Sequence, residues 1–169
     1  MERQARPSTR RTMRGRLLLT AACIWLAATQ SPAFAQPTSE LPLVVVISTG
    51  GTIAGRGGST TSLTEYKSGS ITGSELVDAV PEIKSYARVR VEQIANIGST
   101  NMNPGIWLKL ASRINAIFST EPQVAGVVVT HGTNTLEETA YFLNLTVKHD
   151  KPVVLVGAQR PATAISADG

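Results

Sequence analysis

The chain has 169 residues, of which 42% are apolar and 17% charged, so it can form one packed domain and is not a wholly disordered chain. Its formal net charge of +4 comes from the N-terminus. Residues 1–35 hold six arginines and one acidic residue, whereas residues 36–169 hold ten basic and eleven acidic residues. A nucleic-acid-binding surface needs a basic patch in the folded part of a protein. We therefore expect no nucleic-acid partner.

The N-terminal segment predicts export from the cytoplasm. Arginines precede an apolar run at residues 17–28, which is too short for a membrane-spanning helix of about 20 apolar residues. A small-x-small cleavage site (Ala-Phe-Ala) follows at residues 33–35. We interpret residues 1–35 as a signal peptide, whose removal leaves a periplasmic chain without a membrane anchor and without cysteine. Two arginines at residues 10–11 leave twin-arginine export open, and Cys23 in the apolar run leaves a lipid anchor open.

Four segments have the pattern of strands, and two of them are the continuous apolar runs of strands buried on both faces. These segments are residues 43–48, 88–97, 124–129 and 153–156. Because helices or long connections separate them, we expect an α/β fold that is doubly wound, with a mainly parallel sheet and helices on both faces. Residues 157–169 have only the pattern of a loop, so we expect this sheet to be incomplete at the C-terminus.

Capping signals predict three helices between the strands. A capping box at residues 72–75 opens a short helix that ends at Pro81. Asn103 precedes a proline and starts the second helix as its N-cap, and Asn134 is expected to cap the third, with Glu137 at its third position. Apolar stripes and aromatic residues predict the helical part of the core: Trp107, Leu110, Ala111, Ile114 and Phe118, then Leu136, Ala140, Tyr141, Phe142, Leu143 and Val147.

Polar turns follow all four strands. In a parallel sheet the carboxyl ends of the strands share one edge, and ligands bind there. The turns at residues 49–55, 98–103, 130–134 and 158–161 are all rich in glycine, hydroxyl or amide groups. Turn residues are polar in most proteins, so one such turn would mean little. Four of them at the same edge predict a binding site.

The residue types at this edge favour a hydroxyl nucleophile over a metal. The chain has only two histidines, His131 and His149, without the spacing of a metal site, and we expect each to be solvated or hydrogen-bonded. No serine occurs in a G-x-S-x-G nucleophile elbow. Thr52 follows two glycines directly after the first strand, and Thr133 has the same placement after the third. Either threonine can act as a nucleophile if a neighbouring group accepts its proton.

Two of these segments resemble a known family. TGGTIAG at residues 49–55 and THGTNTLEETA at residues 130–140 are similar to the two signature segments of the bacterial-type L-asparaginases. The similarity extends from about Leu41 to Gly169, through NIGS (96–99), VGAQRP (156–161) and SADG (166–169). With its leader, the chain resembles the type II, periplasmic branch. By this resemblance, residues 36–169 are the N-terminal part of the family's N-terminal α/β domain, without the rest of that domain or the second domain.

The resemblance implies hydrolysis of the side-chain amide of L-asparagine to L-aspartate and ammonia, and it allows some activity on L-glutamine. It implies a homotetramer and neither a metal nor an organic cofactor. The family's nucleophile matches Thr52, which forms an acyl-enzyme and is hydrogen-bonded by the residue matching Tyr66. Tyr66 lies in residues 56–69, a Gly/Ser-rich segment that we expect to be a mobile loop and a lid. The second threonine of the family, which works with a neighbouring acid and a downstream lysine, matches Thr133.

The implied substrate-binding groups include two departures from the family. The family's serine for the substrate α-carboxylate matches Ser99, and backbone near Gly51, Gly98 and Ala158 frames the pocket. At the two positions that recognise the α-amino group, the family has aspartate where this chain has Asn134, and glutamine or glutamate where it has Thr100. We expect weaker recognition of a free α-amino acid. Because the family's lysine would lie beyond Gly169, we also expect residues 1–169 alone to be inactive.

Two other functions remain open. The Ser48–Thr52 segment resembles the phosphate loop of flavodoxin-like flavin binders, but it runs into Gly57-Gly58-Ser59 instead of the helix that such a site uses. The other is a non-catalytic periplasmic module that binds an amino acid. Asn134 and the missing lysine keep this second alternative open.

Overall fold

The computed structural model describes residues 40–169. Residues 1–35, interpreted above as a signal peptide, lie outside the described residues, as does Cys23. The strands of the main sheet are β1 (Leu43–Gly50), β4 (Arg88–Ile97), β5 (Val124–Thr130) and β6 (Val153–Val156). The helices are α2 (Gly73–Asp78), α3 (Pro104–Thr120) and α4 (Leu136–Thr146). Within the described part of the chain, no helix is both long enough and apolar enough to cross a membrane.

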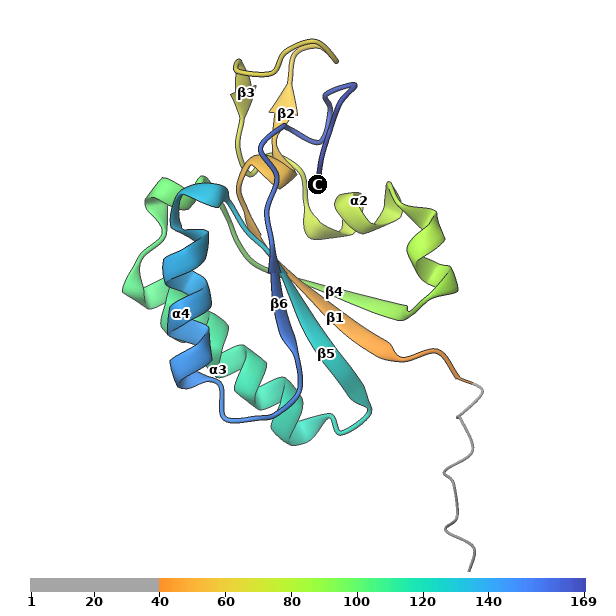
Figure 1. The fold of residues 1–169 in the computed structure, drawn as a ribbon, viewed down its shortest axis with the longest axis vertical. Coiled ribbons are helices and arrows are strands. Elements are labelled where there is room, and N and C mark those ends of the chain that lie inside the picture. The colour runs from red at the N-terminus through yellow and green to blue at the C-terminus, as the bar shows by residue number, and fades with distance from the viewer. Residues whose placement is uncertain (1–39) are drawn as a thin grey trace, which may run out of the picture. The chain divides into compact units, whose positions relative to one another are not determined.

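All four strands of the main sheet are parallel and lie in the order β4-β1-β5-β6. Helices α3 and α4 cover one face, and α2 lies against the other, where its Gly73 packs closely on the side chains of Ser48 and Val91 (Figure 1). This is the doubly wound α/β fold predicted from the alternation of strands and helices.

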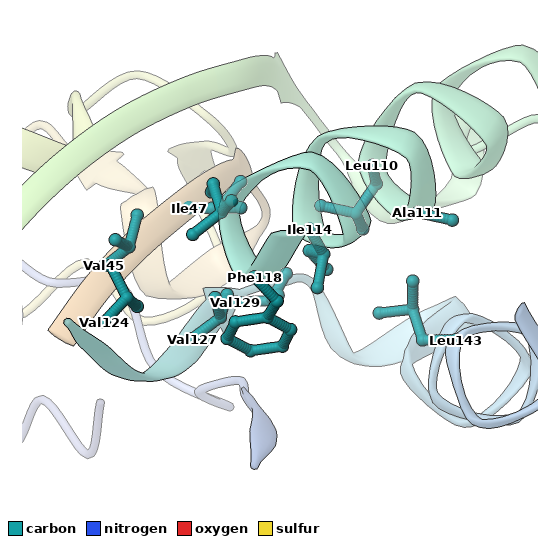
Figure 2. Packing of buried hydrophobic residues seen from close by; sticks show 11 residues of the cluster. Val45, Ile47, Leu110, Ala111, Ile114, Phe118, Val124, Val127, Val129 and Leu143 are labelled. Carbon is teal, nitrogen blue, oxygen red and sulfur yellow. The ribbon is translucent and has the colours of Figure 1, made fainter. Parts of the chain in front are cut away.

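The main core lies between β1, β5 and helix α3 (Figure 2). Alternate residues of β1, Val45 and Ile47, have no exposed surface and face the apolar stripe of α3. The buried residues of that stripe are Leu110, Ala111, Ile114, Ile117 and Phe118. Burying each large aliphatic side chain stabilises the fold by about 1.5–3 kcal/mol. The prediction that Tyr141 belongs to the core is wrong, because Tyr141 is 67% exposed on the outer face of α4.

Two of the three predicted helix caps are confirmed. The capping box between Thr72 and Glu75 is present, and Asn103 accepts a hydrogen bond from the backbone N–H of Ile106. The cap predicted at Asn134 is wrong. Residues Thr133–Thr135 form a 3₁₀ turn. The N-cap of α4 is Thr135, whose side chain makes no capping hydrogen bond. The Asn134 side chain instead accepts a hydrogen bond from the hydroxyl of Ser99.

Residues 56–69, expected to be a loop, contain a short two-stranded ribbon. Strands β2 (Arg56–Gly57) and β3 (Tyr66–Lys67) are antiparallel, and residues 58–65 connect them. The expectation is therefore wrong for the four paired residues. The ribbon also contacts the C-terminal segment, because the backbone N–H of Gly57 donates to the Thr163 hydroxyl. The pairing determines where Tyr66 lies, which matters for the site described below.

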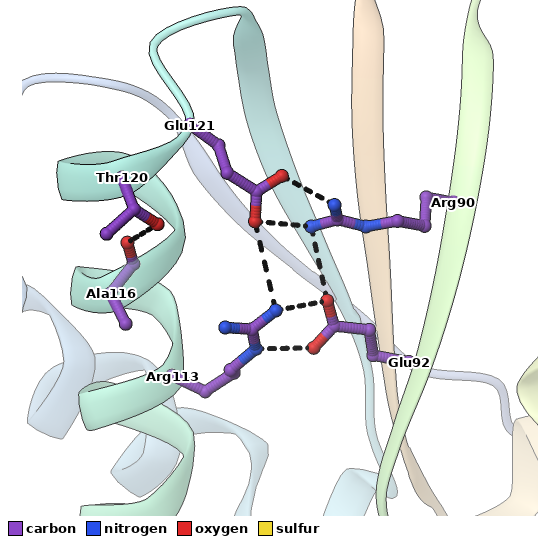
Figure 3. Close-up of polar contacts among 6 residues, drawn as sticks. All are labelled: Arg90, Glu92, Arg113, Ala116, Thr120 and Glu121. Atoms are coloured by element: carbon purple, nitrogen blue, oxygen red, sulfur yellow. Dashed lines mark hydrogen bonds and ion pairs between the residues drawn. The ribbon is translucent and has the colours of Figure 1, made fainter.

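Four alternating charges join β4 to the C-terminal half of α3 (Figure 3). Arg113 donates two hydrogen bonds to Glu92, at 2.7 and 2.8 Å, and Arg90 donates two to Glu121. Arg90 also lies 3.2 Å from Glu92. The hydrogen bonds from Arg113 lower the pKa of Glu92, and those from Arg90 lower the pKa of Glu121. The cluster therefore stabilises the charged form of both carboxyl groups.

We predict that Glu92→Gln lowers the free energy of unfolding at pH 7 by on the order of 1 kcal/mol, because it leaves Arg113 without its main partner. A carboxyl whose pKa is lowered by folding adds stability above its unfolded pKa, here near 4.5, and this stability is lost as the pH falls through the folded-state pKa. The difference from wild type should thus shrink as the pH falls below 4.5 and through the folded-state pKa of Glu92. Urea unfolding across this pH range measures it. The matched control is Glu82→Gln at an exposed glutamate, and an equal loss in both variants would contradict the prediction.

Candidate active site

The site lies where the order of the strands changes direction. From β1 the chain passes to β4 on one side of it, and then crosses to β5 on the other side. In open α/β sheets such a switch point leaves a crevice at the carboxyl ends of the strands, and ligands bind in it. Here the switch point lies between the turns that follow β1 and β5. These are the turns that carry the two candidate threonines.

The backbones of these two turns touch at a pair of glycines. A Cβ atom on Gly51 would lie 2.3 Å from the Cα of Gly132, closer than any side chain can come. Gly51 has a φ of 84°, which also favours glycine, and its N–H donates to the carbonyl of Ile97 at the end of β4. Thr52 and Thr133 directly follow the two glycines, and both are half-buried. The structure thus brings the two threonines onto adjacent turns at one edge of the sheet.

Thr52 is hydrogen-bonded to Tyr66. The distance between Thr52 Oγ1 and Tyr66 Oη is 2.8 Å, and either hydroxyl can donate. Gly55 makes this contact possible, because a Cβ atom there would lie 2.8 Å from the Cδ2 atom of the Tyr66 ring. The contact between this threonine and this tyrosine is the one that the family resemblance implies. It forms through the β2–β3 ribbon, which turns Tyr66 back over the turn after β1.

Ser99 and Asn134 hold each other through two hydrogen bonds. The Ser99 hydroxyl accepts a hydrogen bond from the Asn134 backbone N–H and donates one to the Asn134 side-chain oxygen, both at 3.1 Å. Thr135 adds a hydrogen bond from its hydroxyl to the Ser99 carbonyl. Ser99 also packs against the glycine pair, since a Cβ atom on Gly132 would lie 2.5 Å from its Oγ. The next residue, Thr100, is exposed in the same turn.

The turn after β6 lies beneath the turn after β1. Ala158 is only 3% exposed and packs with Ile53 and Ala54 in a small apolar cluster. A Cβ atom on Gly157 would lie 3.3 Å from the methyl group of Thr133. In the turn after β4, a Cβ atom on Gly98 would lie 3.7 Å from the side chain of Ser68. All four polar turns therefore meet at one edge, as predicted.

Sequence reasoning did not predict the contacts of the buried polar residues around these turns, apart from the expectation that His131 is solvated or hydrogen-bonded. Thr49 donates to the carbonyl of Thr130, and the Thr130 hydroxyl donates to that of Ser48, which joins the ends of β1 and β5. His131 has no exposed surface, and burial lowers its pKa. Its ring is hydrogen-bonded to the hydroxyl of Thr139, a residue that no prediction had singled out. A hydroxyl residue that ends an otherwise apolar strand is the signal that could have found Thr49 and Thr130.

The polar groups of these turns are hydroxyls, amides and backbone N–H groups. Within residues 40–169, no group of three or more histidine, cysteine, aspartate or glutamate residues is arranged to hold a metal ion. The fold and this edge define a doubly wound α/β protein that presents hydroxyl side chains at the carboxyl ends of its strands.

Comparison with known proteins agrees with this class. The family profile "Asparaginase, N-terminal" matches residues 43–169. The chain is 59% identical over 139 residues to L-asparaginase 2 of Bacillus subtilis, covering 82% of this chain and 37% of that relative. It is 54% identical over 131 residues to the "Probable L-asparaginase periplasmic" of Haemophilus influenzae, covering 78% and 36%. A solved structure, the "Probable Cytoplasmic L-asparaginase" from Campylobacter jejuni, is 56% identical with a TM-score of 0.73, covering 76% of this chain and 38% of that one.

The chain belongs to the asparaginase family. It spans a little more than a third of the length of these relatives.

We predict that Gly51→Ala destabilises the protein, because the new methyl group would meet the Gly132 backbone and the left-handed φ would cost roughly 1–3 kcal/mol more. Thermal unfolding measures the loss. The matched control is Gly58→Ala in the neighbouring ribbon, where a Cβ atom would meet nothing within 4 Å. A Gly51→Ala protein as stable as the Gly58→Ala protein would mean that the two turns do not touch.

Proposed function

We propose that the protein hydrolyses the side-chain amide of L-asparagine to L-aspartate and ammonia, with some activity on L-glutamine. One observation carries this proposal in a chain of the asparaginase family. Thr52 is half-buried at the switch point of the sheet, and its hydroxyl lies 2.8 Å from the hydroxyl of Tyr66. A hydroxyl becomes a nucleophile when a neighbour helps to remove its proton, and this contact supplies such a neighbour.

The proposed reaction has two steps. The Thr52 oxygen attacks the amide carbon of the substrate, the carbon–nitrogen bond breaks, and the nitrogen leaves as ammonia with the threonine proton. Water then attacks the resulting ester, which releases aspartate and restores the threonine hydroxyl. Thr133 lies on the adjacent turn, and we assign it to the proton transfers of these steps. Backbone N–H groups of the turns would stabilise the negative charge that develops on the amide oxygen.

We assign the α-carboxylate and α-amino end of the substrate to the edge formed by Ser99, Thr100 and Asn134, with backbone near Gly51, Gly98 and Ala158 framing the pocket. Asn134 is uncharged, and its side-chain oxygen already accepts a hydrogen bond from Ser99. Charge-assisted hydrogen bonds are about twice as strong as neutral ones. The site should therefore bind the α-ammonium group less tightly than a site with a carboxylate at this position.

We also propose a periplasmic location and a homotetrameric assembly. The arginine-rich start of the sequence, its apolar run and its cleavage site support export, and one relative carries the word periplasmic in its name. The solved relative from Campylobacter jejuni is instead called cytoplasmic. Export therefore rests mainly on this chain's own N-terminal sequence.

A non-catalytic amino-acid-binding protein is the second candidate, and Asn134 is the observation that favours it. The flavin-binding alternative has less support. The strand order does match that of flavodoxin-like proteins. The turn after β1, however, continues into a 3₁₀ turn (Thr52–Ala54) and then β2, and not into the helix N-terminus that would bind a phosphate.

We predict that Thr52→Val lowers the rate of ammonia release from asparagine by roughly 10³-fold or more, because it removes the nucleophile but keeps the shape of the side chain. A coupled ammonia assay on the purified full-length protein measures the rate. The control is Thr61→Val, an exposed threonine of the same ribbon, which should keep wild-type activity. Near wild-type turnover by Thr52→Val would contradict the assignment. Calorimetric binding of asparagine without ammonia release by the wild type would favour the binding-protein alternative.

We predict that Asn134→Asp raises kcat/KM for asparagine by about tenfold, since a carboxylate forms a charge-assisted hydrogen bond with the α-ammonium group. An aspartate also keeps an oxygen that can accept from the Ser99 hydroxyl. Steady-state kinetics measure the change, with Asn144→Asp on the exposed side of α4 as the control for added charge. Unchanged constants in Asn134→Asp would remove this explanation of substrate recognition.

A further inference from the structure

A chain of hydrogen bonds runs from α3 through α4 to the turn that carries Thr133. The indole N–H of Trp107 donates to the Thr139 hydroxyl at 2.7 Å, and this hydroxyl lies 2.9 Å from Nε2 of His131. Nδ1 of His131 lies 2.7 Å from the carbonyl oxygen of Gly132. Thr139 and His131 have no exposed surface, so water does not compete for these contacts. None of these three side chains has a role in the reaction described above.

The chemistry of the two ends determines where each proton lies. An indole N–H can only donate and a carbonyl oxygen can only accept. Thr139 must therefore accept from Trp107 and donate its own proton to Nε2, which leaves the ring proton of His131 on Nδ1, facing Gly132. Burial also lowers the pKa of His131, in keeping with a neutral ring. Each of these three hydrogen bonds is thus donated in the direction from Trp107 towards Gly132.

Trp107, which begins this series of hydrogen bonds, is itself held in place. The ring of Trp107 stacks on Phe142 of α4, with ring centres 5.5 Å apart and an angle of 21° between the rings. Trp107 lies in α3, and Thr139 and Phe142 lie in α4. The two helices that cover one face of the sheet therefore fix the position of the His131 ring.

Gly132 needs such a contact more than another residue would. Glycine has no Cβ, so its backbone angles are restrained least. Its φ and ψ here are −85° and 154°, and they set the direction of the Thr133 that follows. A larger residue could not replace it, because the backbone of Gly51 and the side chain of Ser99 fill the space beside it. The orientation of the Gly132–Thr133 peptide has to be set by hydrogen bonds, and the bond from His131 is one that holds its carbonyl.

We propose that His131 is a positioning residue: its Nδ1–H, held by the Trp107–Thr139 hydrogen bonds, orients the Gly132 carbonyl and thereby turns the Thr133 hydroxyl towards Thr52. This inference rests on the proposed amide hydrolysis, in which Thr133 takes part. It assigns His131 no contact with the substrate. We call the hydrogen bonds from Trp107 through Thr139 and His131 to Gly132 the relay. Loss of the relay should therefore slow the reaction and leave substrate binding nearly unchanged.

The test is Thr139→Val in the full-length protein, because valine keeps the shape of threonine and removes the hydroxyl in the middle of the relay. We expect kcat for asparagine to fall roughly 10–100-fold while KM changes less than about twofold. Histidine labelled with ¹⁵N reports the ring: Nδ1 is protonated in the wild type, and the variant should show a mixture of the two neutral forms. Thr139→Ser restores the hydroxyl and should recover both kcat and the wild-type spectrum.

The matched control is Thr146→Val on the same helix, whose hydroxyl donates only to the Phe142 carbonyl, and it should keep wild-type kcat and spectrum. If Thr139→Val does not fold, Trp107→Phe removes the N–H and keeps an aromatic ring against Phe142. We then expect smaller changes of the same kind in kcat and in the ¹⁵N spectrum. Wild-type kcat in a folded relay variant, or a loss that Thr139→Ser does not recover, would overturn the positioning role. A wild-type protein without ammonia release would instead overturn the proposed function, and the positioning role with it.

Discussion

The contact between the backbones of Gly51 and Gly132 is the constraint on which the site depends. The turn after β1 continues into the β2–β3 ribbon, whereas the turn after β5 leads into α4, so the two turns diverge soon after the strands end. They can meet only directly above the sheet, and only if neither has a side chain at the point of contact. Thr52 and Thr133 are the next residues on the two turns. The pair of glycines therefore brings two hydroxyl residues, 81 positions apart in the sequence, onto adjacent turns.

Polar and apolar interactions hold this contact from three sides. A hydrogen bond from the Thr49 hydroxyl to the Thr130 carbonyl joins the strands just below the turns. Ser99 fits against Gly132 and ties the turn after β4 to the turn after β5. The third side is a small apolar cluster that includes Ile53. A reaction between two hydroxyl residues and a small substrate needs this kind of support, since small displacements of reacting groups cost large factors in rate.

Much of the fold could be predicted from the sequence, because the apolar strand runs and two of the helix caps are local signals that the tertiary structure leaves unchanged. The errors arose where a distant partner decides the outcome. Asn134 looks like a helix cap, but the Ser99 hydroxyl engages its side chain. Of the site, the convergence of four turns followed from parallel topology, whereas the partnership of Thr52 and Tyr66 came only from a family resemblance. The role of Thr139 had no sequence signal, because it is one hydroxyl on a helix and its partners are known only from packing.

The most direct test of this account is to identify the residue that becomes acylated. The full-length protein would be mixed with a β-ester of aspartate that deacylates slowly, quenched in acid, digested and analysed by mass spectrometry. The account predicts an aspartyl group on the peptide that contains Thr52, at the turn after β1, and its absence from the Thr52→Val protein. An aspartyl group on the Thr133 peptide, or turnover of the ester with no acylated peptide at all, would contradict it.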